Sequence, residues 1–255
     1  MAPASPLTST ILPSLPKDVY NFWFQHIKAE DNLTLPSTED VKVWFTRDTN
    51  FDRACITQFG PALESIRAVS PTAGQLLDLV QPSAAQDWLG LVLLLDQLPR
   101  NCYRDGDAAV VFEVFDPLAL GVAMRAIQAG VPTSPGVKYR LALRQWFYLP
   151  LMHSEDMKIQ ELCAEMYRRM AADVDRVVDG ADAGAGLSGE EAACASVLAK
   201  DPDAARTLCA LNIKFQDMHK DIIARFGRYP HRNKALGRVS TSEEDKFLRE
   251  ENQLA

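Results

Sequence analysis

The chain has 255 residues, of which 47% are hydrophobic and 24% are charged, a composition typical of a globular protein with a substantial core. Its formal net charge of -7 argues against nucleic acid and anionic lipid as partners, because both usually require a basic surface. The longest apolar run, residues 88–95, is far shorter than the roughly twenty residues that cross a bilayer, so no membrane anchor is expected.

Five cysteines are scattered along the chain without a C-x-x-C pair. An odd number of widely spread cysteines fits neither a disulfide framework nor a zinc knuckle. We therefore expect reduced thiols and a cytoplasmic protein.

One domain is expected, covering residues 17–255 after a flexible arm of residues 1–16. The arm holds four prolines and no basic residue, so it lacks the charged start and continuous apolar run of a signal peptide. Residues 179–189 are rich in glycine and alanine. Such a segment buries too little apolar area to offset the entropy of ordering it, which predicts a mobile surface loop.

Apolar residues recur at spacings of three and four through most of the chain, and period-two alternation is rare. This pattern predicts an all-α protein. The expected helices cover residues 17–28, a segment starting at a cap near Thr38, and residues 50–68 (bent near Gly60 and Pro61), 87–98, 107–129, 137–149, 155–178, 190–199, 202–226 and 242–251. The helix at 87–98 is apolar on every side, which is typical of a helix surrounded by other helices. Antiparallel helix hairpins around this central helix are the expected architecture.

Four segments carry a likeness to a known family: FWF at 22–24, LLLDQLPRN at 93–101, YLPLMHSED at 148–156 and HKDIIARFGRYPHRNKALGRVST at 219–241. With these segments the chain resembles, over roughly residues 19–249, the bacterial and fungal proteins known as domain of unknown function 924. The resemblance implies a tetratricopeptide-like helical bundle. It implies no activity and no catalytic residues, so the chemistry is inferred from the residues themselves.

Asp96 follows the apolar part of the central helix, where a carboxylate is costly unless it is paired. Pro99 lacks a backbone N–H and is expected to end this helix, which would leave Arg100 and Asn101 in a loop. Two interpretations are open. Asp96 pairs with a cation such as Arg100 or caps a neighbouring helix, or Arg100 and Asn101 face a ligand pocket.

The segment from His153 to Asp156 precedes an expected helix. Ser154 suits the cap position, and Glu155 and Asp156 suit the positive end of the helix dipole. The dipole disfavours a protonated ring at His153, so a neutral imidazole able to act as a general base is expected. A purely structural helix start is the alternative.

Two further histidines lie near the C-terminus. His219 flanks the apolar stripe of the helix at 202–226 and is either a half-buried structural residue or an acid-base group. After Gly227, a natural helix stop, comes a loop with Arg228, His231 and Asn233, which ends at a capping box at 241–244. This loop either binds a ligand or pairs its arginines with surface acids.

These residues favour an enzyme without cofactor or metal that acts on an anionic or carbonyl-bearing small molecule by hydrolysis, elimination or isomerisation. The histidines lack an H-x-x-x-H spacing, which argues against a metal site. Three polar segments, 96–101, the one containing His153, and 228–233, are expected to converge on one pocket. The alternative function is a tetratricopeptide-like module that binds a peptide or protein without catalysis. The expected catalytic residues are His153, Glu155, Asp156, His219 and His231, and the expected substrate-binding residues are Asp96, Arg100, Asn101, Arg228 and Asn233.

Overall fold

The computed structural model describes residues 7, 10–104, 106–180 and 186–251. Within these residues there is no strand, so the all-α expectation is confirmed. The helices are α2 (Leu15–Phe24), α3 (Asp31–Thr34), α4 (Thr38–Phe45), α5 (Thr49–Val69), α6 (Ala73–Val80), α7 (Ala85–Cys102), α8 (Ala108–Val110), α9 (Asp116–Gln128), α10 (Leu141–Arg144), α11 (Leu149–Met152), α12 (Met157–Val178), α13 (Gly189–Lys200), α14 (Pro202–Phe226) and α15 (Ser242–Glu251).

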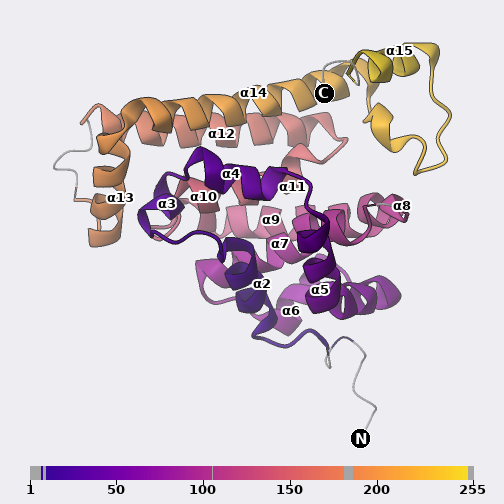
Figure 1. Ribbon diagram of the computed structural model, residues 1–255, viewed down its shortest axis with the longest axis horizontal. Helices are drawn as coiled ribbons and strands as arrows, with labels where there is room; N and C mark the ends of the chain where they lie inside the picture. The colour runs from indigo at the N-terminus through magenta and orange to yellow at the C-terminus, as the bar shows by residue number, and fades with distance from the viewer. Residues whose placement is uncertain (1–6, 8–9, 105, 181–185, 252–255) are drawn as a thin grey trace, which may run out of the picture.

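Helix α7 lies at the centre of the bundle and packs against α2, α5 and α9. Its residues 91–95 are fully buried, as expected for a helix that is apolar on every side. The two longest helices, α12 and α14, form an antiparallel pair across one side of the molecule, and α13 connects them at one end (Figure 1). After α14 the chain turns back, and Arg232 of the following loop lies 3.2 Å from Asp116 of α9.

Helices α2 and α7 approach closely at Gly90. A side-chain carbon at this position would lie 1.8 Å from the backbone oxygen of Pro16, so only glycine permits the contact. Helix α2 begins at Leu15, and Leu7 and Ile11 are also buried. The segment expected as a flexible arm therefore packs on the core at these two residues, because their apolar side chains gain burial there.

The central helix continues through Pro99 to Cys102, so the expectation that it ends at Leu98 is wrong. Proline removes one hydrogen bond, but tertiary contacts hold the last turn. Arg100 donates to Asp116 at 2.6 Å, and Asn101 donates to Asp52 at 2.7 Å. Both side chains thus project from a helix, not from a loop.

Other expected boundaries shift by a few residues. The segment 107–129 contains a π-helical turn over Val111–Phe115, and the segment 137–149 is broken into α10 and a 3₁₀ turn over Gln145–Phe147 before α11. Helices α3 and α6 were not expected. The bounds of α14 and α15 agree with those expected, and Gly227 ends α14 with a φ of 67°.

Two helix caps differ from expectation by one or two residues. Ser37 caps α4 where Thr38 was expected, and Asp156 caps α12 where Ser154 was expected. In both cases the side chain of the observed cap residue accepts a free amide proton of the first turn. Residues 181–185 of the glycine-rich segment lie outside the described residues.

The five cysteines are free thiols. Among the described residues, no helix combines the length and the apolar character that a membrane crossing demands.

Candidate functional site

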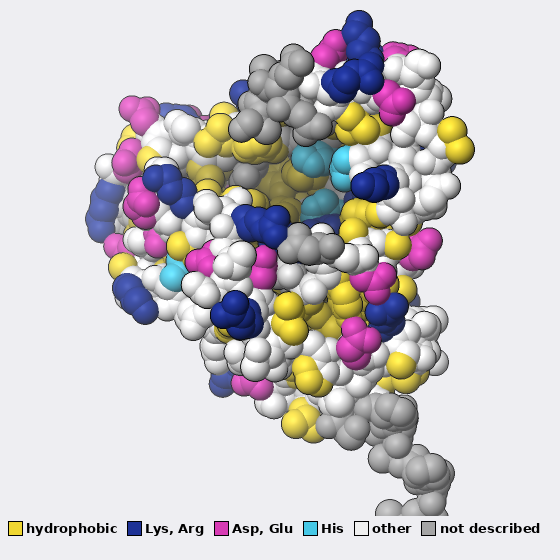
Figure 2. All heavy atoms as spheres, turned by 45° about the vertical axis from the view of Figure 1, so that its right-hand side comes forward, with side chains coloured by type: hydrophobic (Ala, Val, Ile, Leu, Met, Phe, Trp, Pro, Cys, Tyr) yellow, Lys and Arg dark blue, Asp and Glu magenta, His cyan; other side chains and the backbone are white. Residues whose placement is uncertain are grey.

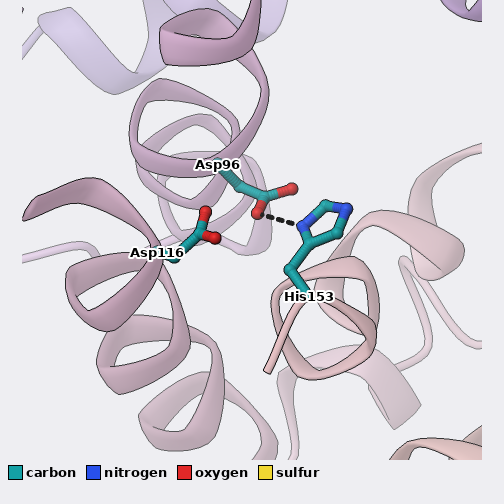
Figure 3. Close-up of side chains that lie close together, drawn as sticks. All are labelled: Asp96, Asp116 and His153. Atoms are coloured by element: carbon teal, nitrogen blue, oxygen red, sulfur yellow. Dashed lines mark hydrogen bonds and ion pairs between the residues drawn. The ribbon is translucent and has the colours of Figure 1, made fainter. Parts of the chain in front are cut away.

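The centre of the site is a contact between Asp96 of α7 and His153, the residue that ends α11. The His153 Nδ1 and Asp96 Oδ1 atoms lie 2.7 Å apart (Figure 3). An ionised carboxylate can only accept a hydrogen bond, so Nδ1 carries the proton, and in the neutral form of the ring Nε2 holds the free electron pair. Nε2 points away from both Asp96 and Asp116 (Figure 3), and no described residue bonds to it.

The Asp96 side chain is buried, with only 1% of it exposed, and it is nevertheless ionised. Burial raises the pKa of this carboxyl, but His153 and Arg100 lower the pKa by more than burial raises it. The pKa therefore lies below the ordinary value. Gln97 donates to the second carboxylate oxygen at 2.6 Å, and Arg100 lies 3.5 Å from the first. The carboxylate is thereby fixed in position and in charge.

A second carboxylate, that of Asp116, lies beside this pair. Asp116 directly follows the π-helical turn, a distortion that often occurs at functional sites. Its Oδ1 accepts from Arg100, and its Oδ2 lies 3.2 Å from Arg232 without a hydrogen bond. Negative and positive side chains thus alternate from Asp96 through Arg100 and Asp116 to Arg232.

The site offers three ligand atoms that could in principle hold a metal ion. One atom each from Asp96, Asp116 and His153 lies within 4.8 Å of the others. Carboxylate and imidazole ligands would suit a divalent transition metal. However, Arg100 and Arg232 already neutralise the two carboxylates, and a metal ion would be repelled by both guanidinium groups.

The loop after α14 packs directly on the segment that carries His153. Arg232 donates to the His153 carbonyl oxygen at 2.8 Å, and the Tyr229 backbone N–H donates to Glu155 at 2.9 Å. Arg238 also pairs with Glu155 at 2.9 Å. The expected approach of the three segments is seen in the Asp96–His153 contact and in the hydrogen bond from Arg232 to the His153 carbonyl oxygen, although the cavity next to His153 is lined by Arg232 and by no residue of 96–101.

A cavity of about 340 Å³ opens beside the pair, within the size range of small-molecule sites. The wall includes His153, Asp116, Glu155, Arg232 and Arg238, together with apolar residues such as Phe112. On the face drawn in Figure 2, histidine side chains gather at a hollow with apolar side chains in its depth.

His219 and His231 both contact Tyr229, with ring centroids 5.8 Å and 5.5 Å from the tyrosine ring. Burial lowers the pKa of His219, whose Nδ1 bonds to the Phe215 carbonyl oxygen. Burial, with the positive charge of Arg232, lowers the pKa of His231 to about 4. Both rings are therefore neutral at pH 7.

Comparison with known proteins agrees with the fold. A family model described as "Bacterial protein of unknown function (DUF924)" matches residues 19–252. The chain belongs to the DUF924 family. A solved structure, that of protein of unknown function ATU0120 from Agrobacterium tumefaciens, is 27% identical with a TM-score of 0.60. The similarity covers 93% of this chain and 98% of that one. The curated proteins contain no match.

In this DUF924 protein, four of the expected site residues are directed elsewhere. Asn101 donates to Asp52, and Asn233 donates to Ser240 at 3.1 Å. Arg228 forms two hydrogen bonds with Glu244, at 2.6 and 2.8 Å. Asp156 accepts from the first amides of α12. Contacts with α5, with α15 and the loop before it, and with the start of α12 account for these four side chains.

Three residues of the DUF924 site were not expected from the sequence: Gln97, Asp116 and Arg232. A signal for Asp116 was present, because it lies between apolar residues in VFDPLAL, the same argument that singled out Asp96. Arg232 lies within the 228–233 loop that was expected to contribute. No local pattern indicates Gln97, which acts only through its contact with Asp96.

Proposed function

We propose that this DUF924 protein is an enzyme in which the Asp96–His153 pair performs acid-base chemistry on a small molecule. The observation that carries the proposal is the 2.7 Å contact between a buried carboxylate and Nδ1 of a histidine whose Nε2 is free. A carboxylate in this position fixes the tautomer and stabilises the imidazolium that forms when Nε2 takes a proton. The same geometry supports hydrolysis, elimination and isomerisation.

The cavity next to His153 supports a substrate with an anionic or carbonyl group. Arg232 and Arg238 line it with His153, and guanidinium groups stabilise oxygens that gain negative charge during a reaction. Glu155 and Asp116 partly neutralise both arginines. The substrate oxygen would therefore compete with these carboxylates, which favours a compact, strongly polar group over a bulky anion.

A screen with histidine variants tests the function. Wild-type protein is incubated with small esters, amides, hydroxy acids and keto acids, and product formation is compared with that of His153→Gln. The matched control is His26→Gln, a histidine whose ring contacts Trp44 and the Asp40 carbonyl oxygen. We expect turnover that is lost in His153→Gln and kept in His26→Gln. Turnover that persists in His153→Gln, or none with any compound, contradicts the proposal.

A second candidate function is a module that binds a peptide or protein without catalysis. It is favoured by apolar side chains that α14 exposes, with Leu211 44%, Phe215 52% and Met218 48% exposed. Exposed apolar residues in a row are a common feature of binding surfaces. Substitution of Phe215 by serine separates the two functions, because it would abolish partner binding and leave the turnover that depends on His153 unchanged.

A further inference from the structure

Three consecutive backbone carbonyls around His153 each accept a hydrogen bond from a side chain outside this segment. Gln160 Nε2 donates to the Met152 and Ser154 oxygens, at 2.7 Å in both cases. Tyr229 Oη donates to the Met152 oxygen at 2.5 Å, and Arg232 donates to the His153 oxygen at 2.8 Å. The peptide that carries the histidine is thus held on both sides of its α-carbon.

The groups that hold this segment form a buried network. Gln160 and Gln216 are fully buried, and Tyr229 is 1% exposed. Tyr229 Oη also lies 2.8 Å from Gln160 Nε2, and Gln216 donates to Gln160 Oε1 at 2.8 Å. Because Gln216 fixes the Gln160 amide from the acceptor side, the donor side can point only at the two carbonyls. Helices α12 and α14 and the loop after α14 thereby meet at one short segment.

Capping of α12 does not explain this network. Asp156 accepts from Lys158 and Ile159, and Ser154 accepts from Asp156, so the start of α12 is already satisfied. Helix α11 has only four residues, and its own hydrogen bonds constrain its end weakly. Without the side-chain contacts, the backbone at His153 would be held only by the turn bonds of α11 itself, such as that from the His153 N–H to the Leu149 carbonyl oxygen at 3.0 Å.

We infer that Gln160 and Tyr229 are positioning residues that set the direction of the His153 ring toward Asp96. The inference rests on the proposed acid-base function for its purpose, but it concerns a hydrogen bond that can be observed without a substrate. Neither residue takes part in the hydrogen bond between Asp96 and His153, so both act through the backbone of residues 152–154. A displacement of about 1 Å at such a group can reduce a catalysed rate about 100-fold.

The test uses the full chain labelled with ¹⁵N-histidine. Proton and long-range ¹H–¹⁵N spectra report whether the His153 Nδ1–H proton is held by Asp96, and His153→Gln assigns its signal. Tyr229→Phe keeps the ring, which contacts His219, His231 and Arg232, and removes only the hydroxyl. Gln160→Leu removes the amide. We expect the protected Nδ1–H signal in wild-type protein and its loss to solvent exchange in both variants.

The matched control is Tyr167→Phe. Tyr167 is a buried tyrosine of α12 whose hydroxyl also donates to a backbone carbonyl, that of Gln145 at 3.4 Å. This change should leave the His153 signal intact. Circular dichroism and the melting temperature verify folding, and if Gln160→Leu does not fold, Tyr229→Phe decides alone.

A signal that is retained in a folded Tyr229→Phe or Gln160→Leu variant overturns the inference, as does the absence of the signal in wild-type protein. Loss of the signal in the variants, with no turnover by wild-type protein on any compound, would uphold positioning and contradict the enzymatic function. Where turnover is found, we expect kcat to fall about 100-fold in Tyr229→Phe with KM nearly unchanged.

Discussion

Asp96 and His153 are 57 positions apart in the sequence, and their side chains meet at 2.7 Å in the interior of the site. Asp96 lies in α7 and His153 directly follows α11, and each has further partners that hold it in place. Four measurements test what this arrangement and its supporting fold imply.

The contributions of Asp96 and His153 to stability should differ. Asp96→Asn removes a buried charge that Arg100, Gln97 and His153 all contact, and we expect it to lower the free energy of unfolding by about 2 to 3 kcal/mol. His153→Ala should cost about 1 kcal/mol and leave the melting temperature within a few degrees. Urea unfolding of both single variants and of the double variant measures the coupling free energy between Asp96 and His153. A greater loss in His153→Ala would contradict this assignment.

Stability should depend on pH through His231. The unfolded chain takes up a proton at this residue below its ordinary pKa of 6.5, whereas in the folded chain the pKa is about 4. The unfolded state therefore binds more protons between these values, and the free energy of unfolding falls as pH decreases from 6.5 toward 4. Thermal unfolding from pH 4 to 8 should show a shallower dependence in His231→Gln. Identical profiles would be inconsistent with a lowered pKa.

Affinity for divalent metals should be limited by Arg100. Its guanidinium lies 2.6 Å from Asp116 and 3.5 Å from Asp96, so it neutralises the carboxylates that a metal ion would need. We expect protein purified without chelators to contain zinc and manganese well below one equivalent. Arg100→Met should raise zinc affinity, measured by calorimetry. Stoichiometric metal that is lost with His153→Ala would instead indicate a metalloenzyme.

Close packing between α2 and α7 should make Gly90 intolerant of substitution. The added carbon in Gly90→Ala would lie 1.8 Å from the Pro16 oxygen and 2.5 Å from its carbonyl carbon. Because these are backbone atoms, α2 must move, at a cost of about 3 kcal/mol. Gly106→Ala is the control, since no atom lies within 4 Å of its added carbon. Chemical denaturation should separate the two, and equal stability would show that α2 shifts freely.

Several features follow from the sequence because they depend on local interactions. Apolar spacing predicts the all-α fold and the bounds of α14 and α15, since helix periodicity and capping act within a few residues. The cost of burying a carboxylate singles out Asp96, and the excess of donors in the loop after Gly227 indicates a functional segment. The same argument, applied to the carboxylate of Asp116 between its apolar neighbours, would have identified that residue as well.

Tertiary structure decided the rest. Helix α7 passes Pro99 because Asp116 and Asp52 hold Arg100 and Asn101, and both partners come from other helices. Within residues 228–233, Arg232 and Tyr229 reach the site. Arg228 and Asn233 turn instead to α15 and its capping loop. This division depends on where α14 ends relative to α11. Gln97 and Gln160 have no local signature, because an amide side chain acquires a role only when packing brings a partner within hydrogen-bond distance.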